Sequence, residues 1–351
     1  RLTGYPEGDV RDADPLCSSL IFFSCLDARK EAKESQGVRD AGQLSSTPIF
    51  CPFFDGRKGS LSNTLPMIEI IAYLREQLAA IYDPEETRAI SRWVIEHVTG
   101  YTPAQQILAK DTPIDPQQRE AVRMIVRRLK QHEPIQYIVG ECTFHGLTFS
   151  VNPSVLIPRP ETGELVERIV QRHGATPSLR VLDIGTGSGC IAITLSRQLL
   201  CPQVMALDLS AEAIRTAQAN AERNGAEVRF VCADLFDPHL TLPAPFDLIV
   251  SNPPYVRMSE KRDMASHVLD YEPHAALFVP DDDPLLFYRA IARRAHEWLT
   301  PGGWLYFEIN AALSAETAEL LVAEGYSDVR ISRDMEGKNR FAEGRVGAGG
   351  R

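Results

Sequence analysis

The sequence lacks three features that would narrow its function at once: paired cysteines, an excess of positive charge and a long apolar run. Its seven cysteines are an odd number, and none belongs to a C-x-x-C pair. This usage favours reduced thiols over disulfides or a zinc site. We therefore expect no bound metal and a cytoplasmic location.

Positive charge is in short supply. The chain carries 37 Lys and Arg residues against 47 Asp and Glu residues, which gives a formal net charge of -10. Proteins that bind nucleic acid through its phosphates usually present a basic face. No direct nucleic-acid partner is therefore expected.

Long apolar runs are also missing from the first residues. The longest such stretch, residues 16–26, is interrupted by serines and a cysteine and is far shorter than the roughly 18 residues of a membrane span. It follows Arg11-Asp12-Ala13-Asp14, which is a poor basic region for a signal peptide. We expect neither a membrane segment nor an export signal.

The length and the composition indicate about two globular domains after an unusual leader. The chain has 351 residues, of which 44% are hydrophobic and 24% charged, as in ordinary soluble domains. Residues 1–65 are rich in Gly, Ser, Asp and Pro and show no sustained period. We expect a disordered leader or a gene-model extension there, and a short tail over residues 346–351.

Residues 66–134 have a helical period and predict a small helical bundle. Asp83-Pro84 and Thr102-Pro103 are typical helix starts, with proline at the first helical position. Apolar residues recur at steps of three and four. The expected apolar faces are Ile68, Ile71, Leu74, Leu78 and Ile81; then Ile90, Trp93, Val94 and Val98; then Val122, Ile125, Val126 and Leu129.

Residues 135–156 predict a β-hairpin linker, with Tyr137-Ile138-Val139 as part of it. Strands and helices then alternate over residues 157–345, which predicts an α/β domain with a doubly wound, largely parallel, seven-stranded sheet. Ligands in such sheets bind at the carboxyl ends of the strands. The expected strands are Arg180–Ile184, Val204–Asp208, Val228–Cys232, Phe246–Ser251, Trp304–Ile309 and two more near Val329 and Phe341.

A glycine-rich turn links the first of these strands to a helix: Asp183-Ile184-Gly185-Thr186-Gly187-Ser188-Gly189. Its glycines permit close backbone approach, and the helix start offers free N–H groups. Asp208 ends the second strand, where a carboxylate can accept from both ribose hydroxyls. Asp234 follows the third, with Leu235 or Phe236 against an adenine ring. These positions suit NAD as well, and either aspartate could simply cap a helix.

The fourth strand runs into Asn252-Pro253-Pro254-Tyr255. The Asn252 side-chain oxygen and the Pro253 carbonyl can accept hydrogen bonds from a planar NH2 group, while the prolines fix the turn and add no competing N–H. Tyr255 can pack over the flat group. Glutamine amides and the exocyclic amines of adenine or cytosine fit this pattern, and a plain rigid turn is the alternative.

The order of these motifs resembles the class I (Rossmann-like) S-adenosylmethionine-dependent methyltransferases. In that family the glycine loop faces the methionine part of the cofactor, and the two later carboxylates bind its ribose and adenine. The resemblance implies cofactor contacts from Asp183, Gly185, Thr186, Gly187, Ser188, Gly189, Asp208, Asp234, Leu235 and Asn252. It implies catalytic positions at Asn252, Pro253, Pro254 and Tyr255.

Residues outside the motifs resemble the HemK/PrmC family over about residues 67–345. These enzymes are protein-(glutamine-N5) methyltransferases that act on the Gly-Gly-Gln loop of peptide chain release factors. The resemblance therefore implies S-adenosyl-L-methionine as cofactor and a release factor as partner, held with help from the helical domain. The matching segments are Pro134–Ile138 with Gly140 and Phe144, Val155–Thr162, Glu272-Pro273 with Ala276-Leu277, and Gly337–Phe341.

Two positions depart from the family pattern. Gly163 stands where a second glutamate is common, and Asn310 where glycine is common. Arg159 and Glu161 are interpreted as a buried ion pair that braces the cofactor pocket. The alternatives to glutamine methylation are an N6-adenine methyltransferase acting on DNA or RNA, and a binding protein that keeps the cofactor pocket without turnover.

Overall fold

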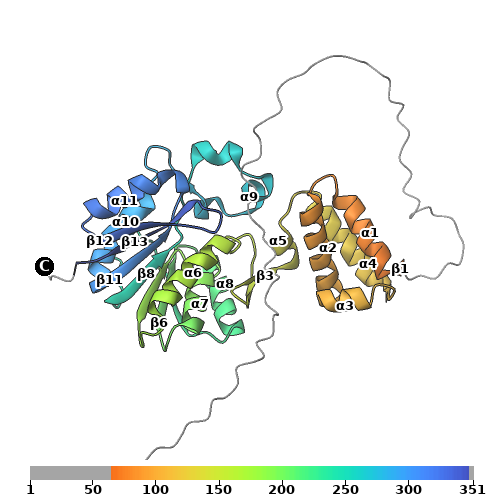
Figure 1. Cartoon of the computed structure of the whole chain (residues 1–351), viewed down its shortest axis with the longest axis horizontal. Coiled ribbons are helices and arrows are strands. Elements are labelled where there is room, and N and C mark those ends of the chain that lie inside the picture. Colours follow the sequence, from red (N-terminus) through yellow and green to blue (C-terminus); the bar gives the residue numbers. More distant parts are fainter. Residues whose placement is uncertain (1–64, 348–351) are drawn as a thin grey trace, which may run out of the picture.

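A computed structural model describes residues 65–347, which form a helical bundle followed by a sheet flanked by helices (Figure 1). The predictions for residues 1–64 and 348–351 lie outside the described residues. Within residues 65–347, no helix is both long and apolar enough to cross a membrane.

The bundle consists of four helices and a two-residue antiparallel ladder. Asp83 and Thr102 cap the second and third helices through their side chains, and Asp115 caps the fourth in the same way. A side-chain oxygen at this position satisfies backbone N–H groups that have no partner within the helix. The elements are β1 (Leu65–Pro66), α1 (Met67–Leu78), α2 (Pro84–Thr99), α3 (Pro103–Leu108), β2 (Pro113–Ile114) and α4 (Pro116–Leu129).

The predicted apolar face of α1 is partly wrong. Ile68 is 45% exposed, whereas Met67 and Ile70 lie in the core beside Leu74 and Leu78. Both registers satisfy a three-and-four period in this apolar run, and packing against α2 and α4 decides between them. The faces predicted around Ile90 and Val94 and around Val122–Leu129 are buried, with Trp93 and Val98 at the edge of the core.

The linker begins with a helical turn rather than a strand. Pro134 caps α5 (Ile135–Val139), and Gly140 ends it with a φ of 84°. The prediction of Tyr137-Ile138-Val139 as part of a β-hairpin is therefore wrong, because a short apolar run fits either period and Pro134 favours a helix start. The hairpin itself forms directly afterwards, as β3 (Glu141–Phe144) and β4 (Leu147–Ser150).

The second unit contains a seven-stranded mixed sheet, which confirms the predicted fold class. Its strand order is β12-β13-β11-β8-β5-β6-β7, and only β13 runs antiparallel to its neighbours. The chain moves from β5 toward β7 and then back past β5 to β8, so ligands are expected at the β5–β8 boundary. The strands are β5 (Arg180–Ile184), β6 (Gln203–Asp208), β7 (Val228–Cys232), β8 (Phe246–Ser251), β11 (Leu299–Glu308), β12 (Ser327–Arg333) and β13 (Asn339–Arg345).

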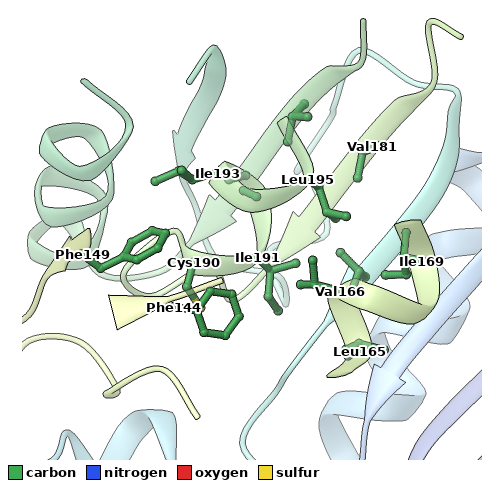
Figure 2. Packing of buried hydrophobic residues seen from close by; sticks show 14 of the residues in the cluster. Phe144, Phe149, Leu165, Val166, Ile169, Val181, Cys190, Ile191, Ile193 and Leu195 are labelled. Carbon is green, nitrogen blue, oxygen red and sulfur yellow. The ribbon is translucent and has the colours of Figure 1, made fainter. Parts of the chain in front are cut away.

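Alternating residues of the strands send their side chains into two cores. Val181 packs with the helices on one face, and Leu182 with those on the other. Figure 2 shows the first core, where α6 and α7 meet the hairpin residues Phe144 and Phe149. The covering helices are α6 (Pro160–His173), α7 (Cys190–Gln198) and α8 (Ala211–Arg223) on this face, and α10 (Leu286–Trp298) and α11 (Ser314–Ala323) on the other.

The segment between β8 and α10 contains short helices and strands that the sequence did not predict. It contains β9 (Val256–Arg257), α9 (Ser266–Tyr271) and β10 (Phe278–Val279), and β9 pairs in parallel with β10. The Tyr271 hydroxyl donates to the Gln131 carbonyl at 2.8 Å. This bond joins the segment that follows the Asn-Pro-Pro-Tyr motif to the helical bundle.

Candidate active site

Polar side chains end five neighbouring parallel strands. In sheet order they are Glu308 at the end of β11, Asn252 after β8, Asp183 in β5, Asp208 at the end of β6 and Asp234 after β7. Parallel strands share one carboxyl edge, so residues far apart in sequence are gathered along a single line. The candidate site lies along this edge, as the sequence predicted.

The glycine turn forms a loop that is open on one side. Gly185, Gly187 and Gly189 have φ values of 74°, 54° and 83°, in the left-handed region. Within residues 65–347, and leaving aside the two chain neighbours of each glycine, no heavy atom lies within 4 Å of the place that a Cβ would occupy on Gly185 or Gly187. At Gly189, by contrast, a Cβ would stand 2.8 Å from the Ile193 side chain. The first two glycines thus leave space for a ligand, and the third permits close helix packing.

Asp183 lies at the base of this loop and is fully buried. Its Oδ2 accepts from the Thr186 hydroxyl at 2.6 Å and from the Ala192 N–H at 3.2 Å. Its Oδ1 has no hydrogen-bond partner among residues 65–347. Burial raises the pKa of Asp183 to about 7, although these two hydrogen bonds act to lower it. Asp183 Oδ1 can therefore still accept a hydrogen bond or interact with a positive charge.

The two later aspartates already hold the loops around them. Asp208 accepts from the Gly187 N–H and from the Ser210 N–H, both at 2.9 Å. Asp234 accepts from the Phe236 N–H at 2.9 Å. Leu235 packs against the sheet core, whereas the Phe236 ring is 44% exposed and meets Phe287 edge to face.

The Asn252–Tyr255 motif is part of a hydrogen-bonded chain. Asn252 Nδ2 donates to the Thr162 hydroxyl at 3.2 Å, and that hydroxyl donates to Glu308 Oε2 at 2.7 Å. The Tyr255 hydroxyl donates to the other oxygen, Glu308 Oε1, at 3.1 Å. The first and last residues of the motif are therefore tied to one carboxylate, through the first turn of α6. Pro253 lies between them and is buried.

Glu308 is a buried carboxylate at this edge of the sheet that the sequence prediction did not include among the site residues. It is 1% exposed, and burial raises the pKa of its carboxyl group, while the Thr162 hydroxyl, the Arg340 charge and the Tyr255 hydroxyl oppose that rise. An acidic residue ending an otherwise apolar strand was the available signal. Burial also raises the pKa of Tyr255.

The two departures from the family pattern have structural counterparts. Asn310 Nδ2 donates to the Tyr255 carbonyl and to Glu260, both at 3.1 Å. The Gly163 carbonyl lies 2.8 Å from His145 Nε2, and the same ring would be 3.2 Å from a Cβ on Gly163. One side chain braces the motif from behind, and the other covers the first turn of α6.

Among the described residues, Arg159 forms an ion pair with Glu272 rather than with Glu161, the partner that the sequence suggested. The Arg159 guanidinium donates to Glu272 Oε1, and the Ile157 N–H donates to Glu272 Oε2 at 3.1 Å. Glu272 is 3% exposed. Residues 159 and 161 are two positions apart at a helix start and do not face each other. The pair instead ties the start of α6 to the segment after α9.

Two family models match different parts of the chain: the PrmC N-terminal domain over residues 69–140, and the Methyltransferase small domain over residues 162–277. A release factor glutamine methyltransferase of Bacteroides thetaiotaomicron is 45% identical over 275 residues, covering 78% of this chain and 98% of the relative. The chain belongs to the release factor glutamine methyltransferase family. It is a methyltransferase that uses S-adenosyl-L-methionine.

Other relatives extend this similarity. The release factor glutamine methyltransferase of Flavobacterium psychrophilum is 42% identical over 269 residues, which cover 76% of this chain and 94% of the relative. A solved methyltransferase of Pyrococcus furiosus is similar to this one with a TM-score of 0.44 and 19% identity, covering 65% of this chain and 98% of that chain.

The glycine loop of this methyltransferase fits its cofactor. S-adenosyl-L-methionine carries an ammonium group and a sulfonium, and Asp183 Oδ1 is a buried oxygen without a partner among the described residues. The space beyond Gly185 and Gly187 is open. A positive ligand on this loop would offset the cost of ionising Asp183.

Proposed function

We propose that this methyltransferase transfers a methyl group from S-adenosyl-L-methionine to the side-chain amide nitrogen, N5, of a glutamine in a release factor, within the Gly-Gly-Gln motif. The observation that carries the proposal is the position of Asn252. It directly follows β8, whose neighbour β5 leads into the glycine loop, in a chain 45% identical to a release factor glutamine methyltransferase.

Asn252, Pro253, Pro254 and Tyr255 would hold the glutamine amide. Asn252 Nδ2 already donates to the Thr162 hydroxyl. The Oδ1 atom of Asn252 can therefore accept a hydrogen bond from an N–H of the glutamine that is to be methylated. The Pro253 carbonyl supplies the second acceptor. Pro254 adds rigidity to the turn, and Tyr255 packs against the flat amide.

The cofactor would lie along the loop and the two strand ends beside it. Asp183 and the residues Gly185, Thr186, Gly187, Ser188 and Gly189 face its methionine part. Asp208 accepts from the ribose hydroxyls, and Asp234 with Leu235 bounds the adenine. Asn252 lies between this cofactor site and the methyl acceptor, which accounts for its place in both residue sets.

An amide nitrogen is a weak nucleophile because its lone pair is delocalised into the carbonyl. When bound, S-adenosyl-L-methionine supplies an electrophilic methyl group: an N–C bond forms, the C–S bond breaks with its electrons remaining on sulfur, and one N–H proton leaves to water. Two acceptors aimed at the two amide hydrogens orient that lone pair. Such positioning contributes up to about 7–11 kcal/mol.

The helical bundle would help to hold the release factor. It precedes the catalytic sheet and is joined to the segment after the motif by the Tyr271–Gln131 hydrogen bond. This bond connects the bundle to the segment that follows Tyr255 in the chain. The acidic net charge of -10 favours a protein partner over direct nucleic-acid binding, and the cysteine usage favours action in the cytoplasm.

Mass spectrometry of a release factor incubated with enzyme and cofactor tests this function. We expect a gain of about 14 daltons on the glutamine of the Gly-Gly-Gln motif, from replacement of one hydrogen by a methyl group. A release factor with Gln→Glu at that position is the matched control and should gain nothing. Methylation of DNA or RNA in the same assay, with an unmodified release factor, would instead favour the N6-adenine alternative.

Asn252→Ala separates catalysis from cofactor binding. Removing one positioned hydrogen bond at a reacting centre costs about 10²- to 10³-fold in rate, so we expect kcat to fall by that factor. Cofactor affinity, measured by calorimetry, should change little. Equal turnover in Asn252→Ala would show that the amide is not oriented by this side chain.

A further inference from the structure

The two ends of the Asn252 amide have the same shape but opposite hydrogen-bonding character. Oδ1 only accepts, and Nδ2 only donates. A methyl acceptor NH2 group needs acceptors, so the amide must present Oδ1 to it and turn Nδ2 away. Nothing in the size of the side chain enforces that choice. The neighbouring hydroxyl of Thr162, 3.2 Å from Nδ2, is the group that can enforce it.

The single hydrogen of the Thr162 hydroxyl determines which end it faces. Its Oγ1 lies 2.7 Å from Glu308 Oε2, and an ionised carboxylate accepts but does not donate. The Thr162 hydrogen is therefore committed to Glu308. Toward Asn252 the hydroxyl offers only lone pairs, so it binds Nδ2 and excludes the flipped amide.

We propose that Glu308 is a positioning residue for methyl transfer: through Thr162 it fixes the orientation of the Asn252 amide, and through its other oxygen it holds the Tyr255 hydroxyl. The inference rests on the proposed function, because it assumes an NH2 acceptor at Asn252. Glu308 does not touch the acceptor. It acts by setting which group donates and which accepts in the hydrogen bonds that link Asn252, Thr162, Glu308 and Tyr255.

A protonated Glu308 would undo this order. Its O–H could donate to Thr162 Oγ1, whose hydrogen could then turn to Asn252 and favour the flipped amide, which offers N–H groups to the acceptor. Charged and titratable groups face Glu308 from each surrounding element: Glu161 on α6, Tyr255 after β8, Tyr288 on α10 and Arg340 on β13. Activity should therefore fall as the pH drops through the raised pKa of Glu308.

Kinetics of three variants test the proposal, with the release factor as substrate. Thr162→Val keeps the shape but removes the hydroxyl, Thr162→Ser keeps the hydroxyl, and Glu308→Gln keeps the shape but can donate. A misplaced reacting group costs about 10²-fold. We expect kcat to fall about 10- to 100-fold in T162V and E308Q, with the KM for the release factor and the cofactor Kd within about threefold of the wild type.

Two readouts separate positioning from a structural role. T162S should restore kcat to within about threefold of the wild type, and E308Q should lose the acidic limb of the wild-type kcat–pH profile. The proposal is overturned if T162V keeps wild-type kcat, if T162S loses as much as T162V, or if the KM or Kd carries the loss. If E308Q does not fold, the two threonine variants still test the Thr162 hydroxyl through which Glu308 is proposed to act, and wild-type kcat in T162V still overturns the proposal. A wild-type enzyme that leaves the glutamine unmethylated overturns both proposals together, whereas an active wild type with an equally active T162V overturns this one alone.

Discussion

Replacing Asp183 by asparagine should stabilise the cofactor-free protein at pH 8 while weakening cofactor binding. The carboxyl group is fully buried, and its Oδ1 has no partner among the described residues. Burial raises its pKa from 3.8 to about 7. A folded state that binds the proton more tightly than the unfolded state loses stability as the pH rises between those two values. The asparagine would carry no such cost, because it does not ionise.

The size of the effect follows from the pKa shift. One pKa unit corresponds to about 1.4 kcal/mol, so the raised pKa of Asp183 lowers the stability of the wild type by about 2 kcal/mol at pH 5 and by about 4 kcal/mol at pH 8. The unpartnered NH2 group of the asparagine costs about 1–3 kcal/mol at every pH. The stability of D183N relative to the wild type should therefore rise by about 2–3 kcal/mol from pH 5 to pH 8.

Urea unfolding of the cofactor-free proteins at pH 5 and pH 8 measures this difference. Asp237→Asn is the matched control, because it makes the same substitution at an exposed aspartate, which accepts from the His239 N–H at 2.9 Å. Calorimetry should show weaker cofactor binding by D183N, because a cationic ligand loses a carboxylate partner. A stability difference that does not change with pH, or a loss of stability confined to pH 8, would refute the reasoning.

Three further substitutions probe the loop and the start of α6. Gly189→Ala should lower the free energy of unfolding by about 2–5 kcal/mol, from left-handed strain and a Cβ 2.8 Å from the Ile193 side chain. Gly187→Ala, with open space at its Cβ, should cost only about 1–2 kcal/mol; equal losses in denaturant titrations would contradict the packing argument. Glu272→Gln should cost about 2–3 kcal/mol, because the partly buried Arg159 then faces a neutral amide. A thermal melt that matches the wild type would show that the pair contributes nothing.

Most of the fold could be predicted from local sequence patterns. The parallel strands of the sheet are largely apolar runs with an Asp, Asn or Glu at or close to the carboxyl end, and the helices keep a three-and-four period between them. The alternation of strands and helices implies a largely parallel sheet, but it does not fix the order of the strands within that sheet. The errors fall where two periods fit equally well, at Ile68 and over Tyr137–Val139. There the neighbouring elements decide, and they are remote in sequence.

The candidate site divides in the same way. The glycine loop and the Asn252–Tyr255 motif each consist of consecutive residues, so each could be recognised in the sequence. The Arg159–Glu272 pair joins residues 113 positions apart, and the Thr162–Glu308 bond joins residues 146 apart. The residue pattern within a single helix or strand does not predict such pairs. They depend on how α6 meets the ends of β8 and β11.

The first turn of α6 is the point at which these long-range contacts meet. Arg159 binds Glu272, Thr162 binds both Asn252 and Glu308, and the Gly163 carbonyl meets His145. A glutamate at position 163 would have to displace the His145 ring, since a Cβ alone would stand 3.2 Å from it. His145, which lies in the hairpin, thus fills space that a glutamate at position 163 would need. The departure at Gly163 therefore changes what covers this turn and leaves the Thr162–Glu308 bond beside it intact.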